Sequence, residues 1–165
     1  MTLTSFEPIS TPQASVLILG SMPSVKSLES QQYYGHPRNA FWKIMQSITA
    51  VPFNASDQAR CDGIKSNGIA VWDVIAQCKR QGSLDADIVA GTIQPNSILT
   101  FLTNHPKIKL IGLNGGTAFK LFKKYFLTDI PKHIHVMQLP STSPAYTLPF
   151  QKKLDHWLTH LIPTS

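Results

Sequence analysis

The sequence contains little cysteine and no long apolar run. Its 165 residues include only Cys61 and Cys78, which do not form a Cys-x-x-Cys pair. A zinc ribbon or iron–sulfur cluster held by four thiolates of this chain alone is thereby excluded. We expect a fold that needs no disulfides, as in a reducing compartment. Apolar residues nowhere run uninterrupted for the ~18 positions of a membrane helix, and residues 1–8 lack the basic and apolar regions of a secretory signal. We therefore expect a soluble, cytoplasmic protein that makes no membrane contact.

Several common catalytic signatures are also absent. The sequence has no GxxxxGKS/T phosphate loop, no GxGxxG dinucleotide turn, no GxSxG nucleophile elbow, no Ser-His-Asp order and no paired catalytic carboxylates. These absences weigh against phosphate-cradle and acyl-transfer mechanisms. His133 and His135 face one side at the start of an expected strand, but no third ligand accompanies them. We therefore expect rim residues there, with neither a metal nor another cofactor.

Acidic residues are scarce in the C-terminal part of the chain. The 15 Lys and Arg residues outnumber the 9 Asp and Glu residues, which gives a net charge of +6. Residues 1–100 are balanced, whereas residues 101–165 carry eight lysines against Asp129 and Asp155 alone. A one-sided basic surface attracts polyanions, because phosphate neutralisation is a large term in nucleic-acid affinity. The charge fits nucleic-acid binding and, equally, a role in solubility.

The apolar pattern predicts one domain over residues 1–165 with alternating strands and helices. Four short, β-branched runs are expected strands, at residues 15–19, 69–75, 108–113 and 134–139. Helical spacing of apolar residues marks 41–48, a stretch ending near 104, 117–125 and 150–161. Asn39 is placed to cap the first of these helices, and Asn96 or Ser97 the second. This order predicts a three-layer α/β/α fold around a central parallel sheet of about four strands.

The expected sheet indicates where a ligand would bind. In open parallel sheets, ligands occupy the crevice beyond the carboxyl ends of the strands. The segments that leave those ends are rich in small, polar and proline residues, and they span 20–24, 72–73, 114–116 and 140–146. Asp73 is the only acidic residue expected near this crevice, where it serves either the site or a structural turn.

Two further segments suit a nucleic-acid ligand. Residues 33–39 place two tyrosines, a histidine, an arginine and an asparagine ahead of an apolar helix. Aromatic rings stack on bases and an Asn amide pairs with a base edge, although Tyr33 could equally lie in the core and Asn39 could be a helix cap. Residues 141–146 combine three hydroxyls with a proline and a tyrosine, which suits phosphate binding and wedging into a base stack, or a plain strand-to-helix connection.

Several blocks of the sequence stand out, and the first and last of them are specific, whereas the Asn-Gly pair at 114–115 by itself is not. They are residues 16–23 (VLILGSMP), 27–28, 33–42 (YYGHPRNAFW), 68–74 (GIAVWDV), 82–85 (GSLD), 114–115 and 139–145 (LPSTSPA). Over nearly the whole chain these blocks resemble the uracil-DNA glycosylase superfamily and, within it, the hypoxanthine-DNA (DNA-deoxyinosine) glycosylases. The resemblance implies an α/β/α fold, a nucleotide flipped into a pocket beyond the strand ends, and metal-free hydrolysis of the N-glycosidic bond.

The resemblance also implies roles for individual residues. Asn39 maps onto the catalytic asparagine of the family. The implied base pocket contains Gly20, Ser21, Met22, Pro23, Tyr34, Asp73 and Asn114, with Tyr34 in the place of an aromatic that stacks on the base. The implied DNA contacts are His36, Arg38, Ser141, Thr142, Ser143, Pro144, Ala145 and Tyr146. The expected partner is DNA with deaminated bases, bound by a monomeric, monofunctional enzyme that needs no protein partner.

Met22 departs from the superfamily pattern. It occupies the place where an Asn, Asp or Glu usually positions the attacking water, and a thioether neither orients water nor accepts a proton. Asn39 carries a neutral amide, so it can orient water and a base edge but cannot act as a general base. This predicts a dissociative reaction, in which the bond breaks first and DNA phosphates help to stabilise the sugar cation.

The base preference follows from hydrogen-bond patterns. An oriented Asn39 amide matches the adjacent N–H donor and carbonyl acceptor of hypoxanthine, whereas adenine presents the opposite pattern. Uracil offers the same pair as hypoxanthine, so pocket size must separate the two. We expect a hypoxanthine-DNA glycosylase of base excision repair. One alternative is a uracil or mismatch-specific glycosylase. The other is a non-catalytic nucleic-acid-binding module, and Met22 favours this second alternative. Asn114 either touches the base or allows the turn before Gly115.

Overall fold

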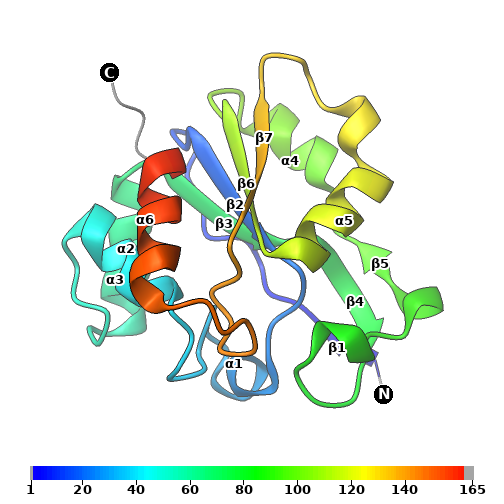
Figure 1. The fold of residues 1–165 in the computed structure, drawn as a ribbon. Coiled ribbons are helices and arrows are strands. Elements are labelled where there is room, and N and C mark those ends of the chain that lie inside the picture. The colour runs from blue at the N-terminus through cyan, green and yellow to red at the C-terminus, as the bar shows by residue number, and fades with distance from the viewer. Residues whose placement is uncertain (1, 162–165) are drawn as a thin grey trace.

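The computed structural model describes residues 2–161 and has a four-stranded parallel sheet at its centre (Figure 1). In spatial order the strands are β3 (Ile69–Asp73), β2 (Val16–Gly20), β6 (Leu110–Asn114) and β7 (His135–Leu139). Gly20 is in register with Asp73, and Leu19 with Leu113, so neighbouring strands end at one edge. The predicted parallel sheet is confirmed.

Helices cover both faces of this sheet. On one face lie α2 (Phe41–Thr49), α3 (Asp57–Ser66) and α6 (Phe150–Leu161), and on the other lie α4 (Ile98–Asn104) and α5 (Gly116–Tyr125) (Figure 1). Ile18 of β2 packs in the first layer with Phe41 and Trp157, whereas Leu17 packs in the second with Phe122, and all five are 0% exposed. A strand covered on both faces is a continuous apolar run. The predicted three-layer α/β/α fold is confirmed.

The sequence pattern does not predict a second, antiparallel sheet. Its strands are β1 (Thr2–Thr4), β4 (Ile75–Lys79) and β5 (Gln94–Pro95), with β4 in the middle. The predicted strand at 69–75 is therefore too long. The chain leaves the parallel sheet after Asp73, where the Val74 N–H donates to the Gly20 carbonyl at 2.8 Å. Ile75 stays buried against Met22 and Cys78, so the apolar run continues across the break.

Two helices, α1 (Val25–Ser30) and α3, are also missing from the sequence prediction. Each begins with a serine cap, which is Ser24 for α1 and Ser56 for α3. Only Gly63 and Ile64 of α3 are buried, so no apolar stripe marks this helix in the sequence. No helix within residues 2–161 is long and apolar enough to cross a membrane.

The helix caps differ in detail from the prediction. Ser97 takes the N-cap position of α4, but its side chain makes no capping bond. Asn96 instead donates its amide to the Asp73 carbonyl at 2.8 Å and so ties the start of α4 to the end of β3. At α2 the cap position belongs to Ala40 rather than Asn39.

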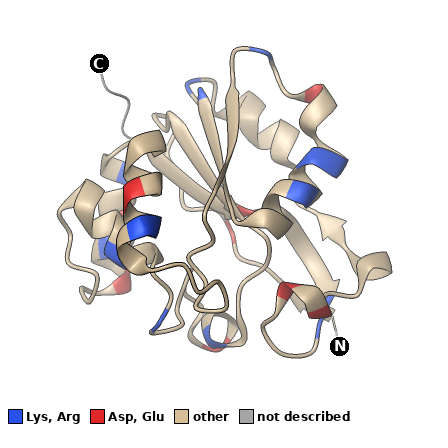
Figure 2. Cartoon of the chain, in the orientation of Figure 1, with Lys and Arg blue, Asp and Glu red and all other residues tan. Residues whose placement is uncertain are grey.

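The lysine excess of the C-terminal part is divided between the two helical layers. Lys120, Lys123 and Lys124 lie on α5, whereas Lys152 and Lys153 lie on α6, on the other side of the sheet (Figure 2). These lysines do not form a single basic face. The net charge by itself therefore does not locate a nucleic-acid surface.

Candidate active site

A pocket of about 360 Å³ opens beyond the carboxyl ends of the parallel strands. Small-molecule sites typically measure roughly 300–1,000 Å³, so a nucleobase fits this volume. Asn39 and all of the expected base-pocket residues line it: Gly20, Ser21, Met22, Pro23, Tyr34, Asp73 and Asn114. Among the expected DNA contacts, the lining includes Ser141, Thr142, Ser143, Ala145 and Tyr146 and leaves out His36, Arg38 and Pro144.

Asn39 stands at the start of α2 with its amide held in one orientation. Its Oδ1 accepts a hydrogen bond from the Phe41 N–H at 3.0 Å. A flipped amide would set its own NH₂ group against that N–H, so this bond decides which way round the amide lies. Among residues 2–161 no acceptor takes the Nδ2 donor, which is left for a ligand in the pocket.

Tyr34 brings a buried hydroxyl to which no described residue bonds. Its ring stacks on Phe41, with centroids 4.0 Å apart and planes at 23°, so only the other ring face can stack on a base. Its φ of 52° is left-handed, which is uncommon for a bulky residue and recurs at functional sites. Burial raises the pKa of the hydroxyl, which therefore stays protonated and can donate. Tyr33 has a core role instead, since it is 7% exposed and donates to the Glu7 carbonyl at 2.8 Å.

Asp73 brings a buried carboxyl group to the pocket. The residue is 3% exposed, and its Oδ2 has no hydrogen-bond partner among the described residues. Gly20 permits this arrangement, because a Cβ at that position would lie 2.6 Å from Oδ1 of Asp73. Burial and the charge of Asp85, opposed by the charge of Arg80, raise the pKa of Asp73 to about 7. Near neutral pH the group is thus divided between a form that donates a hydrogen bond and one that only accepts.

Asn114 lines the pocket and bonds with both ends of its amide to the loop that follows β7. Its Nδ2 donates to Oγ1 of Thr142, and its Oδ1 accepts from the Thr142 N–H, both at 3.0 Å. The Thr142 carbonyl in turn accepts from the Ala40 N–H at 3.0 Å. Of the two roles left open for Asn114, the geometry therefore favours positioning of the chain. Thr142 is 1% exposed, and its hydroxyl group and N–H are both engaged with Asn114.

The loop of residues 140–146 is braced from α6. Nε1 of Trp157 donates to the Pro140 carbonyl at 2.8 Å, and Nζ of Lys153 donates to the Ser143 carbonyl at 3.1 Å. Lys153 is 4% exposed, and its Nζ lies 5.3 Å from the centre of the Tyr146 ring. Tyr146 itself is 47% exposed. The loop thus presents a large aromatic side chain on a fixed base, as a wedge into a base stack requires.

A second loop, residues 82–86, completes the pocket although sequence reasoning assigns it no role. Its lining residues are Ser83, Leu84, Asp85 and Ala86. Oδ1 of Asp85 accepts a hydrogen bond from Oγ of Ser21 at 2.8 Å, so this loop contacts the segment that follows β2. The GSLD block at 82–85 is the sequence signal that marks the loop.

Arg80 fixes the loop of residues 82–86 against the segment after β2. It is 8% exposed and donates to the carbonyls of Pro23 and Gly82, each at 2.6 Å. Oγ of Ser83 adds a third bond by accepting from the Val25 N–H at 2.9 Å. The loop is therefore tied to the segment after β2 at two points, Pro23 and Val25.

Met22 forms an apolar part of the pocket wall. It is 8% exposed and packs against Ile75 and Cys78 of the second sheet. Its thioether therefore supplies no hydrogen-bond acceptor comparable to a carboxylate or an amide, and any water activation must come from another residue.

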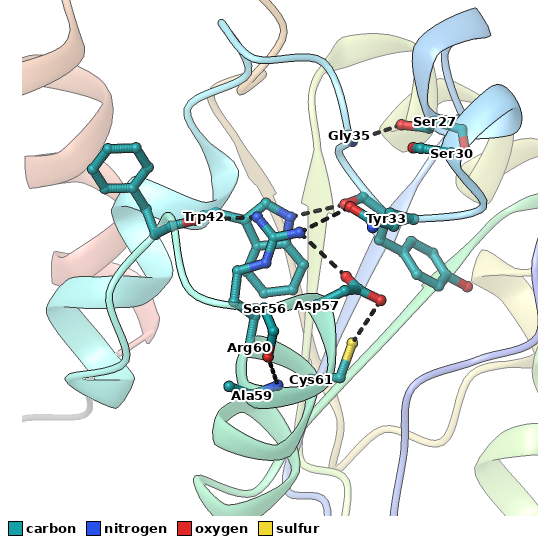
Figure 3. A network of polar contacts seen from close by, with 12 residues as sticks. Ser27, Ser30, Tyr33, Gly35, Trp42, Ser56, Asp57, Ala59, Arg60 and Cys61 are labelled. Carbon is teal, nitrogen blue, oxygen red and sulfur yellow. Dashed lines mark hydrogen bonds and ion pairs between the residues drawn. The ribbon is translucent and has the colours of Figure 1, made fainter.

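A polar network behind the pocket fixes the segment that leads into α2 (Figure 3). Arg60 of α3 lies over the Trp42 ring, 4.4 Å from its centre, and forms an ion pair with Asp57 at 3.2 Å. Nε1 of Trp42 donates to the Tyr33 carbonyl at 2.8 Å. Stacking and hydrogen bonding together set the path of the chain that brings Asn39 to the pocket.

His133 and His135, which we expected at the rim, lie elsewhere. His135 is the first residue of β7, so both side chains belong to the amino ends of the strands, opposite the pocket, and both are exposed. Within residues 2–161, no group of three or more His, Cys, Asp or Glu side chains is arranged to hold a metal ion.

Residues 7–161 match the family model of the Uracil DNA glycosylase superfamily. The chain therefore belongs to the uracil DNA glycosylase superfamily, and its pocket beyond the strand ends is the candidate active site of a DNA glycosylase. Membership of this superfamily is consistent with a hydrolase that acts on N-glycosyl bonds.

The relatives that match this chain include proteins named for one branch of the superfamily. A hypoxanthine DNA glycosylase of Methanosarcina barkeri is 38% identical over 111 residues, which are 67% of this chain and 69% of that protein. A hypoxanthine DNA glycosylase of Methanosarcina acetivorans is 36% identical over 116 residues, 68% of this chain and 71% of that protein. A solution NMR structure from Methanosarcina acetivorans, provisionally assigned as a uracil DNA glycosylase, has a TM-score of 0.80 at 27% identity and covers 97% of this chain and 96% of that one.

Proposed function

We propose that this enzyme excises hypoxanthine from DNA and leaves an abasic site. The observation that carries the proposal is the meeting, in one pocket, of the fixed Asn39 amide with two unpartnered buried groups, the Tyr34 hydroxyl and Oδ2 of Asp73. Unpartnered buried polar groups destabilise a fold, so their presence favours a ligand that bonds to them. The two relatives named hypoxanthine DNA glycosylase support hypoxanthine as that ligand.

The Asn39 amide matches one edge of hypoxanthine. Its Oδ1 keeps a second lone pair beside the bond from Phe41 and accepts the N–H of the base, while Nδ2 donates to the adjacent carbonyl. Adenine presents the opposite order of donor and acceptor. The bond from Phe41 disfavours the amide flip that would accommodate adenine, so the normal base is rejected.

Donors around the base stabilise its departure. When the glycosidic bond breaks, its electron pair leaves with the base, and preorganised donors are the groups that lower the energy of the resulting anion. Nδ2 of Asn39, the Tyr34 hydroxyl and the protonated fraction of Asp73 provide such donors. Because the amide of Asn39 does not take up a proton, its part in catalysis is orientation and electrostatic stabilisation.

Residues at the mouth of the pocket make the contacts with the DNA strand. Tyr146 fills the gap that the extruded base leaves, and the hydroxyl groups of Ser141 and Ser143 face the phosphates. Each of these hydroxyl oxygens accepts a local backbone N–H, which leaves its O–H free to donate. His36 and Arg38 contact the flanking phosphates from outside the pocket wall. We also propose that the enzyme is monomeric and monofunctional.

A comparison of three duplexes tests the base preference. Each duplex carries a single deoxyinosine, deoxyuridine or deoxyadenosine at the same position, and abasic sites are cleaved with alkali after incubation. We expect cleavage of the deoxyinosine duplex, less with deoxyuridine, and none with deoxyadenosine. A faster reaction with deoxyuridine would replace hypoxanthine by uracil as the substrate, and binding without abasic sites in any duplex would favour a non-catalytic DNA-binding protein.

Burial of Asp73 predicts a pH-dependent stability. Its pKa rises from 3.8 to about 7 on folding, so its contribution to stability is full below the lower value and is lost as the pH rises through the higher one. Asp73→Asn removes this titration. In thermal unfolding experiments, we compare the melting temperature of Asp73→Asn with that of the unsubstituted enzyme. We expect the difference, variant minus unsubstituted enzyme, to become more positive as the pH rises from 3.8 to about 7. Asp62→Asn, at an exposed site on α3, should show no such trend. A pH-independent difference for Asp73→Asn would contradict the assignment.

A further inference from the structure

Hydrolysis of a glycosidic bond consumes one water molecule, whose proton must pass to an acceptor. The amides of Asn39 and Asn114 do not accept protons near neutral pH, and the tyrosine hydroxyls are already protonated. Among the pocket-lining residues that the structure describes, only Asp73 and Asp85 carry carboxyl groups. The choice of a general base therefore falls between these two.

The two carboxyl groups lie at different depths. Asp73 is 3% exposed at the end of β3, whereas Asp85 belongs to the exposed loop of residues 82–86 at the pocket mouth. A flipped nucleotide enters base first, and its sugar stays near the mouth because the backbone continues into the duplex. Asp73 therefore meets the base, while Asp85 lies on the side where C1′ of the sugar and the attacking water meet.

We propose that Asp85 is the general base that activates the attacking water, with Ser21 as its positioning residue. This assignment rests on the proposed glycosylase function. The bond between C1′ and the base nitrogen breaks, and its electron pair leaves with the base. The water oxygen bonds to C1′ and passes one proton to the Asp85 carboxylate. Asp85 then releases that proton and the base anion takes one up, so the sum is the addition of one water molecule.

The surroundings of Asp85 suit this role. Oγ of Ser21 donates to Oδ1 at 2.8 Å and so orients the carboxyl group, and in this proposal Oδ2 receives the proton of the attacking water. The residue as a whole is exposed, but it lines the pocket. Partial burial there raises the pKa of Asp85, while hydrogen bonds from Ser21 and Thr117 and the charge of Arg80 lower it. The net rise makes the carboxylate a better proton acceptor near neutral pH.

Asp85→Asn tests the proposal, because asparagine keeps an oxygen for the Ser21 bond and loses the proton acceptor. In single-turnover assays on a deoxyinosine duplex we expect a rate reduced by about a hundredfold, the low end of what a positioned base contributes. Affinity for the duplex should not change. The decline of the rate toward acidic pH, which protonation of Asp85 causes, should be lost. Asp87→Asn, two residues further along in the same short 3₁₀ helix and outside the pocket wall, is the matched control and should keep both rate and pH profile.

A carboxylate in solution provides a second readout that a structural role would not affect. Asp85→Ala should regain part of its rate on addition of sodium formate but not of sodium chloride at the same ionic strength. A rate for Asp85→Asn within about threefold of the unsubstituted enzyme, an unchanged acidic limb, or no rescue by formate would overturn the role of Asp85 and leave the glycosylase function standing. Absence of abasic sites with the unsubstituted enzyme would instead overturn the proposed function itself.

Discussion

Replacement of Asn39 by alanine is expected to slow excision of hypoxanthine by about 10²- to 10³-fold, the effect of removing one preorganised donor from a developing anion. Binding of the same duplex should change little, because the contacts of the loop at 140–146 and of the flanking phosphates remain. The measurement is the single-turnover yield of abasic sites, with duplex affinity determined in parallel. Equal losses of binding and of cleavage would contradict the catalytic role of Asn39.

Asn39→Asp separates this catalytic role from a structural one. Aspartate keeps the oxygen that accepts the Phe41 N–H at the start of α2, and it replaces the Nδ2 donor by a second oxygen that only accepts when ionised. We expect Asn39→Asp to melt close to the unsubstituted enzyme, whereas Asn39→Ala loses about 1 kcal/mol of stability with this helix-start bond. Both variants should be equally slow. An active Asn39→Asp enzyme would show that Nδ2 is not needed.

Alanine at Gly20 is expected to obstruct the deep end of the pocket. Its Cβ would lie 2.6 Å from Oδ1 of Asp73 and 3.0 Å from the Tyr34 hydroxyl, both of which are buried. The two groups must move, and a displacement of about 1 Å at a reacting site can lower the rate by about a hundredfold. We expect at least that loss in the single-turnover rate of Gly20→Ala.

Gly91→Ala is the matched control for this substitution. No atom lies within 4 Å of a Cβ at Gly91, so the same added methyl group meets open space. Its excision rate should equal that of the unsubstituted enzyme. An unimpaired Gly20→Ala enzyme would show that the positions of Asp73 and Tyr34 do not matter for the reaction.

The parallel sheet can be predicted because both of its faces are buried, which leaves unbroken apolar runs such as that of β2. The end of β3 at Asp73 cannot be predicted in this way. Ile75 is also buried, but in the second sheet, so the apolar run continues past the break between the two strands. The helix α3 is missed for the opposite reason. It buries only Gly63 and Ile64 and therefore has no helical period of apolar residues.

The sequence predicts that the site lies at the strand ends and in the loops that carry recognisable motifs. The roles of single residues can be assigned only once the fold shows which side chains contact one another. Asn114 binds Thr142, which is 28 positions away, and that contact, which favours loop positioning over base recognition, is not visible in the sequence. Asp85 lies in a visible sequence block, but its partner Ser21 is 64 positions away. Only the packing of the second sheet against the strand ends brings these two side chains to one pocket.

Identification of the released product tests the proposed function most directly. A duplex with one deoxyinosine is incubated with the enzyme in the presence of a chelator, the small-molecule fraction is analysed by mass spectrometry, and the strand is examined before and after alkali. We expect free hypoxanthine in an amount equal to the abasic sites, with a strand that breaks only after alkali. Bound duplex with no released base, or release of the nucleoside deoxyinosine, would contradict hydrolysis of the glycosidic bond at this pocket.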